Sequence, residues 1–190
     1  MALTQVAGGM IASGQTITSP TITGGTWTSP SGSTITSGTA VASTSGTSID
    51  FTSIPSWVKR ITVMFNGVST NGSSLLRIQL GAGSITSSGY LGASVGPTQS
   101  QTTTGVQFAS GFDIQPFSAS ASSVYVGTVV FTLVTSNTWS CFGVVTQTAS
   151  ITAAVLGGAI PLAGTLDRVR ITTVNGTDTF DAGSINILYE

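Results

Sequence analysis

Beyond residue 50, apolar and polar side chains alternate with a period of two. In WVKRITVMFNGV, Ile61, Val63 and Phe65 share one face, whereas Thr62 and Asn66 share the other. Such alternation is typical of β-strands that pack one face against a core. The stretch LLRIQL alternates in the same way, and we expect its residues Leu76, Ile78 and Leu80 to face the core.

The same pattern recurs along the chain, and no convincing amphipathic helix interrupts it. The chain therefore predicts an all-β fold, a β-sandwich or jelly-roll of about eight to ten short strands. Val124–Val134 is apolar on both faces, as in a central strand or one covered by another subunit. The further strand candidates are residues 105–115, 123–134, 138–148, 151–160, 167–174 and 179–189.

Two Asn-Gly pairs stand where hairpin turns need a positive φ. Asn71-Gly72 predicts a turn between the first two strands. If Asn175-Gly176 forms a two-residue turn, Arg170 falls opposite Asp181 and Ile171 opposite Phe180. The alternation then changes parity before Ile185, which predicts a β-bulge near residues 182–184.

The chain is poor in charge. Only 6% of its residues are charged, against about 25% in a typical domain, and the formal net charge is -1. Because soluble monomers stay dispersed through surface charge, we expect copies of the chain or a larger assembly to cover much of the surface. The alternative is a neutral, Thr-coated β protein. The five basic residues are too few to form the basic patch that nucleic-acid binding requires.

The residue types needed for catalysis are scarce. There is no His, so triads and metal sites that depend on it are excluded. Asp178 and Asp181 are close enough in sequence to hold a cation, but loop aspartates usually cap turns. We expect no enzyme activity, no metal and no cofactor. The single cysteine, Cys141, lies between Trp139 and Phe142 and is expected to be buried rather than reactive.

The first 49 residues contain no charged side chain. Residues 1–46 therefore form a predicted extended Ser/Thr/Gly-rich attachment segment, and residues 47–190 form the sandwich. The spaced apolar residues of the attachment segment are too few to form a core within one chain. They suit either an apolar stripe shared by several copies or a strip that docks on a partner. They are Ile17, Ile22, Trp27 and Ile35. The N-terminus lacks the pattern of a secretion signal, and we expect no membrane insertion.

Two stretches resemble a known family. TSIDFTSIPSWVKRITVMFNGVSTNGSS and LDRVRITTVNGTDTFDAGSINILYE look like a β-sandwich domain of tail-fibre and related virion proteins of tailed bacteriophages, and SPTITGG resembles the attachment repeats of such fibres. The resemblance implies a homotrimer on the virion, joined to tail or capsid proteins through residues 1–46.

On this interpretation the chain is a short tail fibre or spike that binds a host receptor, such as a surface glycan, through its loops. The candidate loops are residues 69–74 and 175–183, with Trp57, Asn71, Asp178 and Asp181 as candidate receptor residues. Trp57 follows Pro55 and is expected to be partly exposed, whereas the other sandwich Trp and Tyr residues favour the core. The main alternative is a capsid head-fibre or decoration protein, and a remote one is a carbohydrate-active enzyme.

Overall fold

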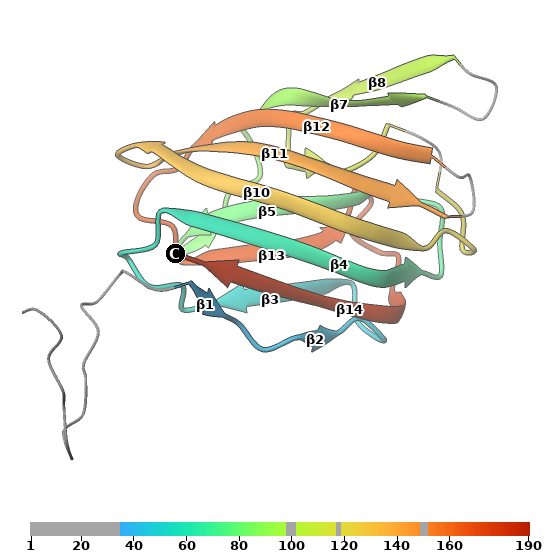
Figure 1. Cartoon of the computed structure of the whole chain (residues 1–190), viewed down its shortest axis with the longest axis horizontal. Helices are drawn as coiled ribbons and strands as arrows, with labels where there is room; N and C mark the ends of the chain where they lie inside the picture. The colour runs from blue at the N-terminus through green and yellow to red at the C-terminus, as the bar shows by residue number, and fades with distance from the viewer. Residues whose placement is uncertain (1–34, 98–101, 117–118, 149–151) are drawn as a thin grey trace, which may run out of the picture. The chain divides into compact units, whose positions relative to one another are not determined.

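The computed structural model describes residues 35–97, 102–116, 119–148 and 152–190, and these contain strands but no helix. Two antiparallel sheets face one another (Figure 1). The all-β sandwich expected from the sequence is therefore confirmed. Of the segment 1–46, only residues 35–46 are described, and two short strands within them pair with the last strand of the chain.

The larger sheet has, in spatial order, β1 (Thr36–Ser37), β14 (Phe180–Tyr189), β4 (Arg60–Thr70), β10 (Tyr125–Thr135), β11 (Thr138–Gln147), β12 (Thr152–Pro161), β7 (Leu91–Pro97) and β8 (Thr103–Gln107), and β2 (Val41–Ala42) also pairs with β14. The smaller sheet has β3 (Ser48–Thr52), β13 (Arg168–Thr173), β5 (Leu76–Ala82) and β6 (Ser84–Ile85), and β9 (Phe112–Asp113) also pairs with β5. The strand β10 lies between β4 and β11, which confirms the prediction of a central strand.

The core lies between the sheets and is built by the alternation seen in the sequence. Ile61 and Val63 of β4 and Ile78 of β5 are fully buried, as predicted. Phe112 stands at the centre of an aromatic cluster. Its ring centroid is 4.8 Å from Tyr90, 5.5 Å from Phe108 and 5.4 Å from Phe131. Elements of both sheets therefore depend on one packed core.

Both predicted hairpins are wrong. The strands β4 and β5 belong to different sheets, as do β13 and β14, so each Asn-Gly pair lies in a connection that crosses from one sheet to the other. Arg170 accordingly lies opposite Asp50 rather than Asp181, and Ile171 lies opposite Ile49 rather than Phe180. Asn-Gly favours any tight change of direction, so it does not say which strand the chain will pair with next.

The predicted bulge is confirmed, with β4 as the partner strand. The pairing of β14 with β4 shifts on both sides of Ala182. Gly183 has φ of 89°, and a Cβ there would lie 2.3 Å from the carbonyl oxygen of Gly67. Only glycine fits this close approach of two backbones.

One strand candidate is divided. Residues 105–115 contain the end of β8 in the larger sheet and β9 in the smaller one, because the chain changes sheet between them. The candidates at 123–134, 138–148, 151–160, 167–174 and 179–189 correspond to β10 to β14. The strands β3 and β7 were not predicted, since β3 is short and β7 is rich in small residues.

Candidate interaction surfaces

The two predicted receptor loops lie side by side. β4 and β14 pair along their length, so the loop after β4 and the loop before β14 meet at one end of the larger sheet. The backbone N–H of Thr179 donates to Asn71 Oδ1 at 2.9 Å, and the N–H of Asn71 donates to the Thr179 carbonyl at 2.9 Å. We call residues 71–74 and 174–179 the paired loops.

Asp178 holds the paired loops together. Its carboxylate accepts the backbone N–H of Ser74 at 2.8 Å and the side-chain amide of Asn175 at 2.6 Å. These hydrogen bonds favour the charged carboxylate and hold the pKa of Asp178 below its usual value. The amide of Asn175 contributes most, and the N–H of Ser74 contributes next. Gly72 leaves room for this carboxylate, since a Cβ there would lie 2.1 Å from it.

The other candidate residues occupy different surroundings. Asp181 accepts a hydrogen bond from the Ser69 hydroxyl. Trp57 is partly exposed, as predicted, but it packs on Tyr189 with ring centroids 5.9 Å apart. Tyr189 pairs with Ile61 at the start of β4, so Trp57 lies at the other end of β4 from Asn71. Among the described residues, no three His, Cys, Asp or Glu side chains gather as metal ligands would.

The end of β4 opposite the paired loops is where the described chain begins and where it ends. Ile35 is largely exposed and lines a small pocket of about 140 Å³ with Arg60, Tyr189 and Glu190. Arg60 forms an ion pair with Glu190, and the backbone N–H groups of Lys59 and Arg60 donate to the Glu190 carbonyl. The other three predicted attachment residues, Ile17, Ile22 and Trp27, lie outside the described residues.

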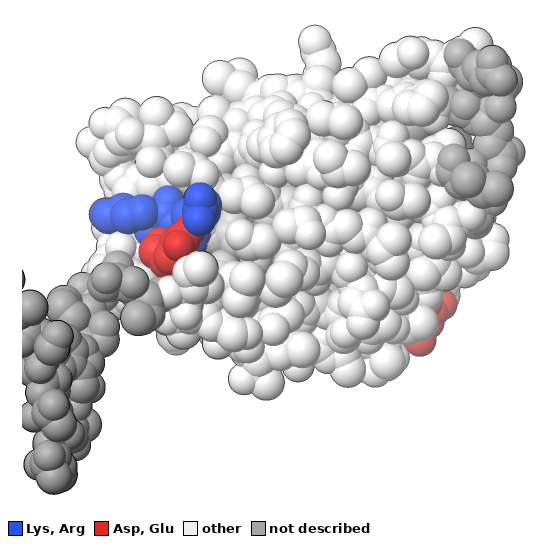
Figure 2. Space-filling model, viewed as in Figure 1, with Lys and Arg blue, Asp and Glu red and all other residues white. Residues whose placement is uncertain are grey.

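The most unusual surface is the outward side of the larger sheet. No charged residue occurs in the sequence between Asp113 and Asp167, nor between Arg77 and Asp113, so β7, β8, β10, β11 and β12 carry no charge. We call the outward-facing side chains of β4, β10, β11, β12 and β7 the outer face. Figure 2 shows that charged atoms on this side of the molecule stand only near its margin.

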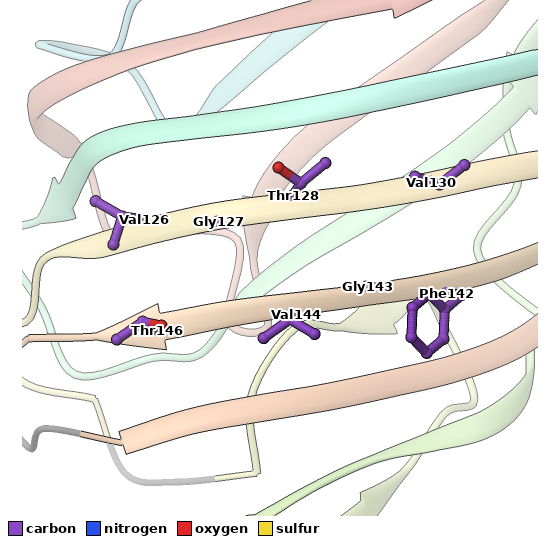
Figure 3. Close-up of a pocket in the computed structure, with 8 residues that line it drawn as sticks. All are labelled: Val126, Gly127, Thr128, Val130, Phe142, Gly143, Val144 and Thr146. Carbon is purple, nitrogen blue, oxygen red and sulfur yellow. The ribbon is translucent and has the colours of Figure 1, made fainter.

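Large apolar side chains stand exposed on the outer face. Phe142 is 62% exposed, and three valines, Val95, Val144 and Val155, are each 43% exposed. A shallow groove of about 450 Å³ runs between β10 and β11 (Figure 3). Three cross-strand pairs line it: Val130 with Phe142, Thr128 with Val144, and Val126 with Thr146.

Two glycines border the groove with their backbone. Gly127 pairs with Val145 and Gly143 with Val129, both buried, so the two glycines stand at inward-facing positions. The pairing of β10 with β4 is irregular just before Gly127. A Cβ on Gly127 would lie 2.3 Å from the Val144 carbonyl oxygen, and one on Gly143 would lie 2.7 Å from the Thr128 carbonyl oxygen. Glycine at both positions therefore permits a close approach of the two backbones.

The sequence interpretation did not identify the outer face as a candidate site, although cover by another subunit was one of its two interpretations of residues 124–134. The signal was present, because the charge-free run from residue 114 to residue 166 contains β10, β11 and β12. Low charge was recognised for the chain as a whole and for its first 49 residues. The charge-free strands form one continuous surface only because they are neighbours in one sheet.

Among the described residues, the Trp and Tyr side chains that the sequence assigned to the core are buried, and so is the thiol. Tyr90, Tyr125 and Trp139 are buried, and burial raises the pKa of Tyr90 to about 12. Cys141 is buried on the inner side of β11, and burial raises the pKa of its thiol. A raised thiol pKa makes the reactive thiolate scarce, so this cysteine packs as a small apolar residue.

Comparisons of the chain with family models, with curated proteins and with solved structures find no match. None of the described segments forms a helix that is long and apolar enough to cross a membrane.

Proposed function

We propose that this protein is a non-enzymatic structural protein of a tailed-phage virion. In this proposal it is a short homotrimeric tail fibre or spike that attaches through residues 1–46 and presents the paired loops to a host receptor. The resemblance of residues 47–82 and 165–190 to fibre sandwich domains supports the assignment, as does the resemblance of SPTITGG to attachment repeats.

The observation that carries the proposal is the polarity of the sandwich. The described chain begins at Ile35 beside the C-terminal Glu190, at the start of β4. The paired loops lie beyond the other end of β4, which is 11 residues long. At about 3.4 Å per residue, these two ends are separated by roughly 35 Å. The chain that precedes Ile35 therefore joins the sandwich at the end away from the paired loops, whereas residues 35–46 run along β14 as part of the sandwich. This arrangement suits attachment through the preceding segment and recognition through the loops.

The acidic side chains also support a structural role. The six in the sequence are Asp50, Asp113, Asp167, Asp178, Asp181 and Glu190. Four form ion pairs with arginines, and the other two, Asp178 and Asp181, tie backbone and hydroxyl groups together. Each of these carboxylates is therefore accounted for by its contribution to the fold.

The paired loops suit a neutral, hydroxyl-rich receptor. They present the hydroxyls of Ser73 and Thr177 and the amide nitrogen of Asn71, while the Asn175 amide and the Asp178 carboxylate are occupied by internal hydrogen bonds. Amide and hydroxyl groups both donate and accept hydrogen bonds, as the hydroxyls of a surface glycan do. A glycan is therefore the receptor class that this proposal names.

Immunogold labelling of phage particles whose genome encodes the chain tests the proposal. We expect label on the tail. Label over the shell would instead support the capsid decoration protein, and particles without label would contradict both. A chain that lacks residues 1–34 should fold but fail to join particles. This cut keeps β1, whose Thr36 and Ser37 pair with β14.

A further inference from the structure

We infer that the outer face is the surface through which this chain associates with further copies of itself. The inference deepens the proposed function, because it assigns the surface through which the copies of the proposed homotrimer associate. The number of copies rests on the proposed function. It is carried by the shape, area and chemistry of the outer face rather than by the resemblance.

The apolar side chains of the outer face are contiguous across five strands. Strand pairing places Met64, Thr128, Val144, Val155 and Val95 in one row, with one residue from each strand. The neighbouring row runs through Thr62, Val130, Phe142, Gly157 and Ala93. Directly opposed side chains in a sheet lie about 5 Å apart, so the first row is an unbroken neutral stripe and the second is interrupted at Gly157.

The area matches what a stable interface requires. The five strands are 11, 11, 10, 10 and 7 residues long. With about 3.4 Å per residue and about 4.8 Å between strands, they span about 800 Å². Specific interfaces bury about 800 Å² on each partner.

Charge identifies the partner. An ordinary protein surface would bring Lys, Arg, Asp and Glu against a face on which β7, β10, β11 and β12 offer no opposite charge, and burying unpaired charge is costly. The outer face of a second copy brings only Arg60, at the start of β4, and Arg60 is already paired with Glu190. A second copy of this chain therefore complements the face better than a protein of average composition.

The outer face also carries a projection and a depression. Phe142 projects from it, and Gly157 of β12 lies beside Phe142 in the pairing, so the ring has no side chain next to it on that strand. The groove between β10 and β11 lies along the same strands and is lined by valine, threonine and phenylalanine side chains. Insertion of Phe142 of one copy into the groove of another would fill both features, and the number of copies rests on the proposed homotrimer.

The test compares the full chain with single variants by size-exclusion chromatography with light scattering. We expect the wild-type chain to elute at about three times its 19.1 kDa. Phe142→Asp should elute as a monomer with an unchanged β-sheet circular dichroism spectrum. Val174→Asp is the matched control, because Val174 is 42% exposed but lies in the paired loops, and it should keep the wild-type mass.

A second variant guards against misfolding. Phe142→Ala removes the ring from an exposed position without adding charge, and should raise the concentration for half-dissociation by at least tenfold, whereas Val174→Ala should leave it unchanged. A monomeric wild-type chain, or a Phe142→Asp protein that keeps the assembled mass, would overturn the inference.

Particle labelling separates this inference from the proposed function. If the wild-type chain is monomeric in solution but Phe142→Asp abolishes its incorporation into particles, the face binds another virion protein. The inference is then wrong and the proposed function stands. If the chain assembles through Phe142 but no phage particle carries it, the inference stands and the proposed function is wrong.

Discussion

The two sheets of the sandwich enclose one core, but their outward sides differ in chemistry. On the smaller sheet, Arg170 of β13 pairs with Asp50 of β3, and Arg77 of β5 pairs with Asp113 of β9. On the larger sheet, β10, β11, β12, β7 and β8 carry no charged residue, and Phe142 and Val144 stand exposed among threonines.

This difference separates what folding requires from what assembly requires. Both sheets satisfy the same requirement on their inner sides, where alternate residues are apolar and buried. Their outer sides are free of that requirement, so their composition reflects what each side meets. The exposed charges of the smaller sheet, Arg170 and Asp50, are suited to water. The absence of charge from β7, β8, β10, β11 and β12 of the larger sheet is suited to a covering partner.

The largest expected effect comes from the core that both sheets share. Phe112→Ala should lower the free energy of unfolding by about 4 kcal/mol, because it empties the centre of the aromatic cluster. Phe142→Ala, the same substitution on the outer face, should change the stability of the monomer by less than about 0.5 kcal/mol. Urea denaturation at dilutions where the chain is monomeric measures both, and equal losses would contradict the division into core and outer face.

The next effect concerns the ion pair of the smaller sheet. Arg77 Nε lies 2.6 Å from Asp113 Oδ1, and the two side chains are only 13% and 6% exposed. Asp113→Asn leaves the guanidinium buried without its counter-charge and should cost about 3 kcal/mol of unfolding free energy. Replacing both, as Arg77→Met with Asp113→Leu, should restore much of the loss. A double variant as unstable as the single one would show that packing, not charge, is the cause.

A smaller effect is expected where the chain crosses between the sheets. Gly72→Ala would push the Asp178 carboxylate away from the Ser74 N–H and so should cost about 1–2 kcal/mol. The φ of Gly72 does not require glycine, so the cost should come from this contact alone. In an Asp178→Ala background the same substitution should be nearly neutral. A double-mutant cycle by thermal denaturation measures the coupling, and a coupling of zero would contradict the assignment.

The smallest effect is expected for the exposed ion pair of the smaller sheet. Arg170 Nε lies 2.7 Å from Asp50 Oδ1, but both side chains are more than a third exposed. Arg170→Ala should therefore cost less than about 1 kcal/mol, and the cost should shrink in high salt. Chemical denaturation at low and high salt checks this. A loss of 3 kcal/mol would place this pair with Arg77 and Asp113 instead.

The sequence predicted the strands well and their neighbours poorly. Alternation identifies which side of a strand is buried, and Ile61, Ile78 and Ile171 are buried as that pattern requires. It does not say which of the two sheets a strand joins. Arg170 was therefore assigned to Asp181, although its partner is Asp50, which is 120 positions away in the sequence.

The candidate surfaces were likewise predicted in part. Asn71 and Asp178 were each identified as loop residues, and the pairing of β4 with β14 brings their loops together. Trp57 was grouped with them because it is partly exposed, but the pairing places it at the other end of β4. The outer face depends on five strands that lie side by side, and a pattern within any single strand does not contain this arrangement.

The buried position of Cys141 has a practical consequence. The sequence contains no other cysteine, and this thiol lies beneath the outer face, one residue from Phe142. A reagent can reach it only when β11 separates from its neighbours, so the rate of labelling measures how often this part of the sheet opens. The unmodified protein thus carries its own probe of local opening. If assembly covers the outer face and restrains β11, Cys141 should be labelled more slowly at higher protein concentration.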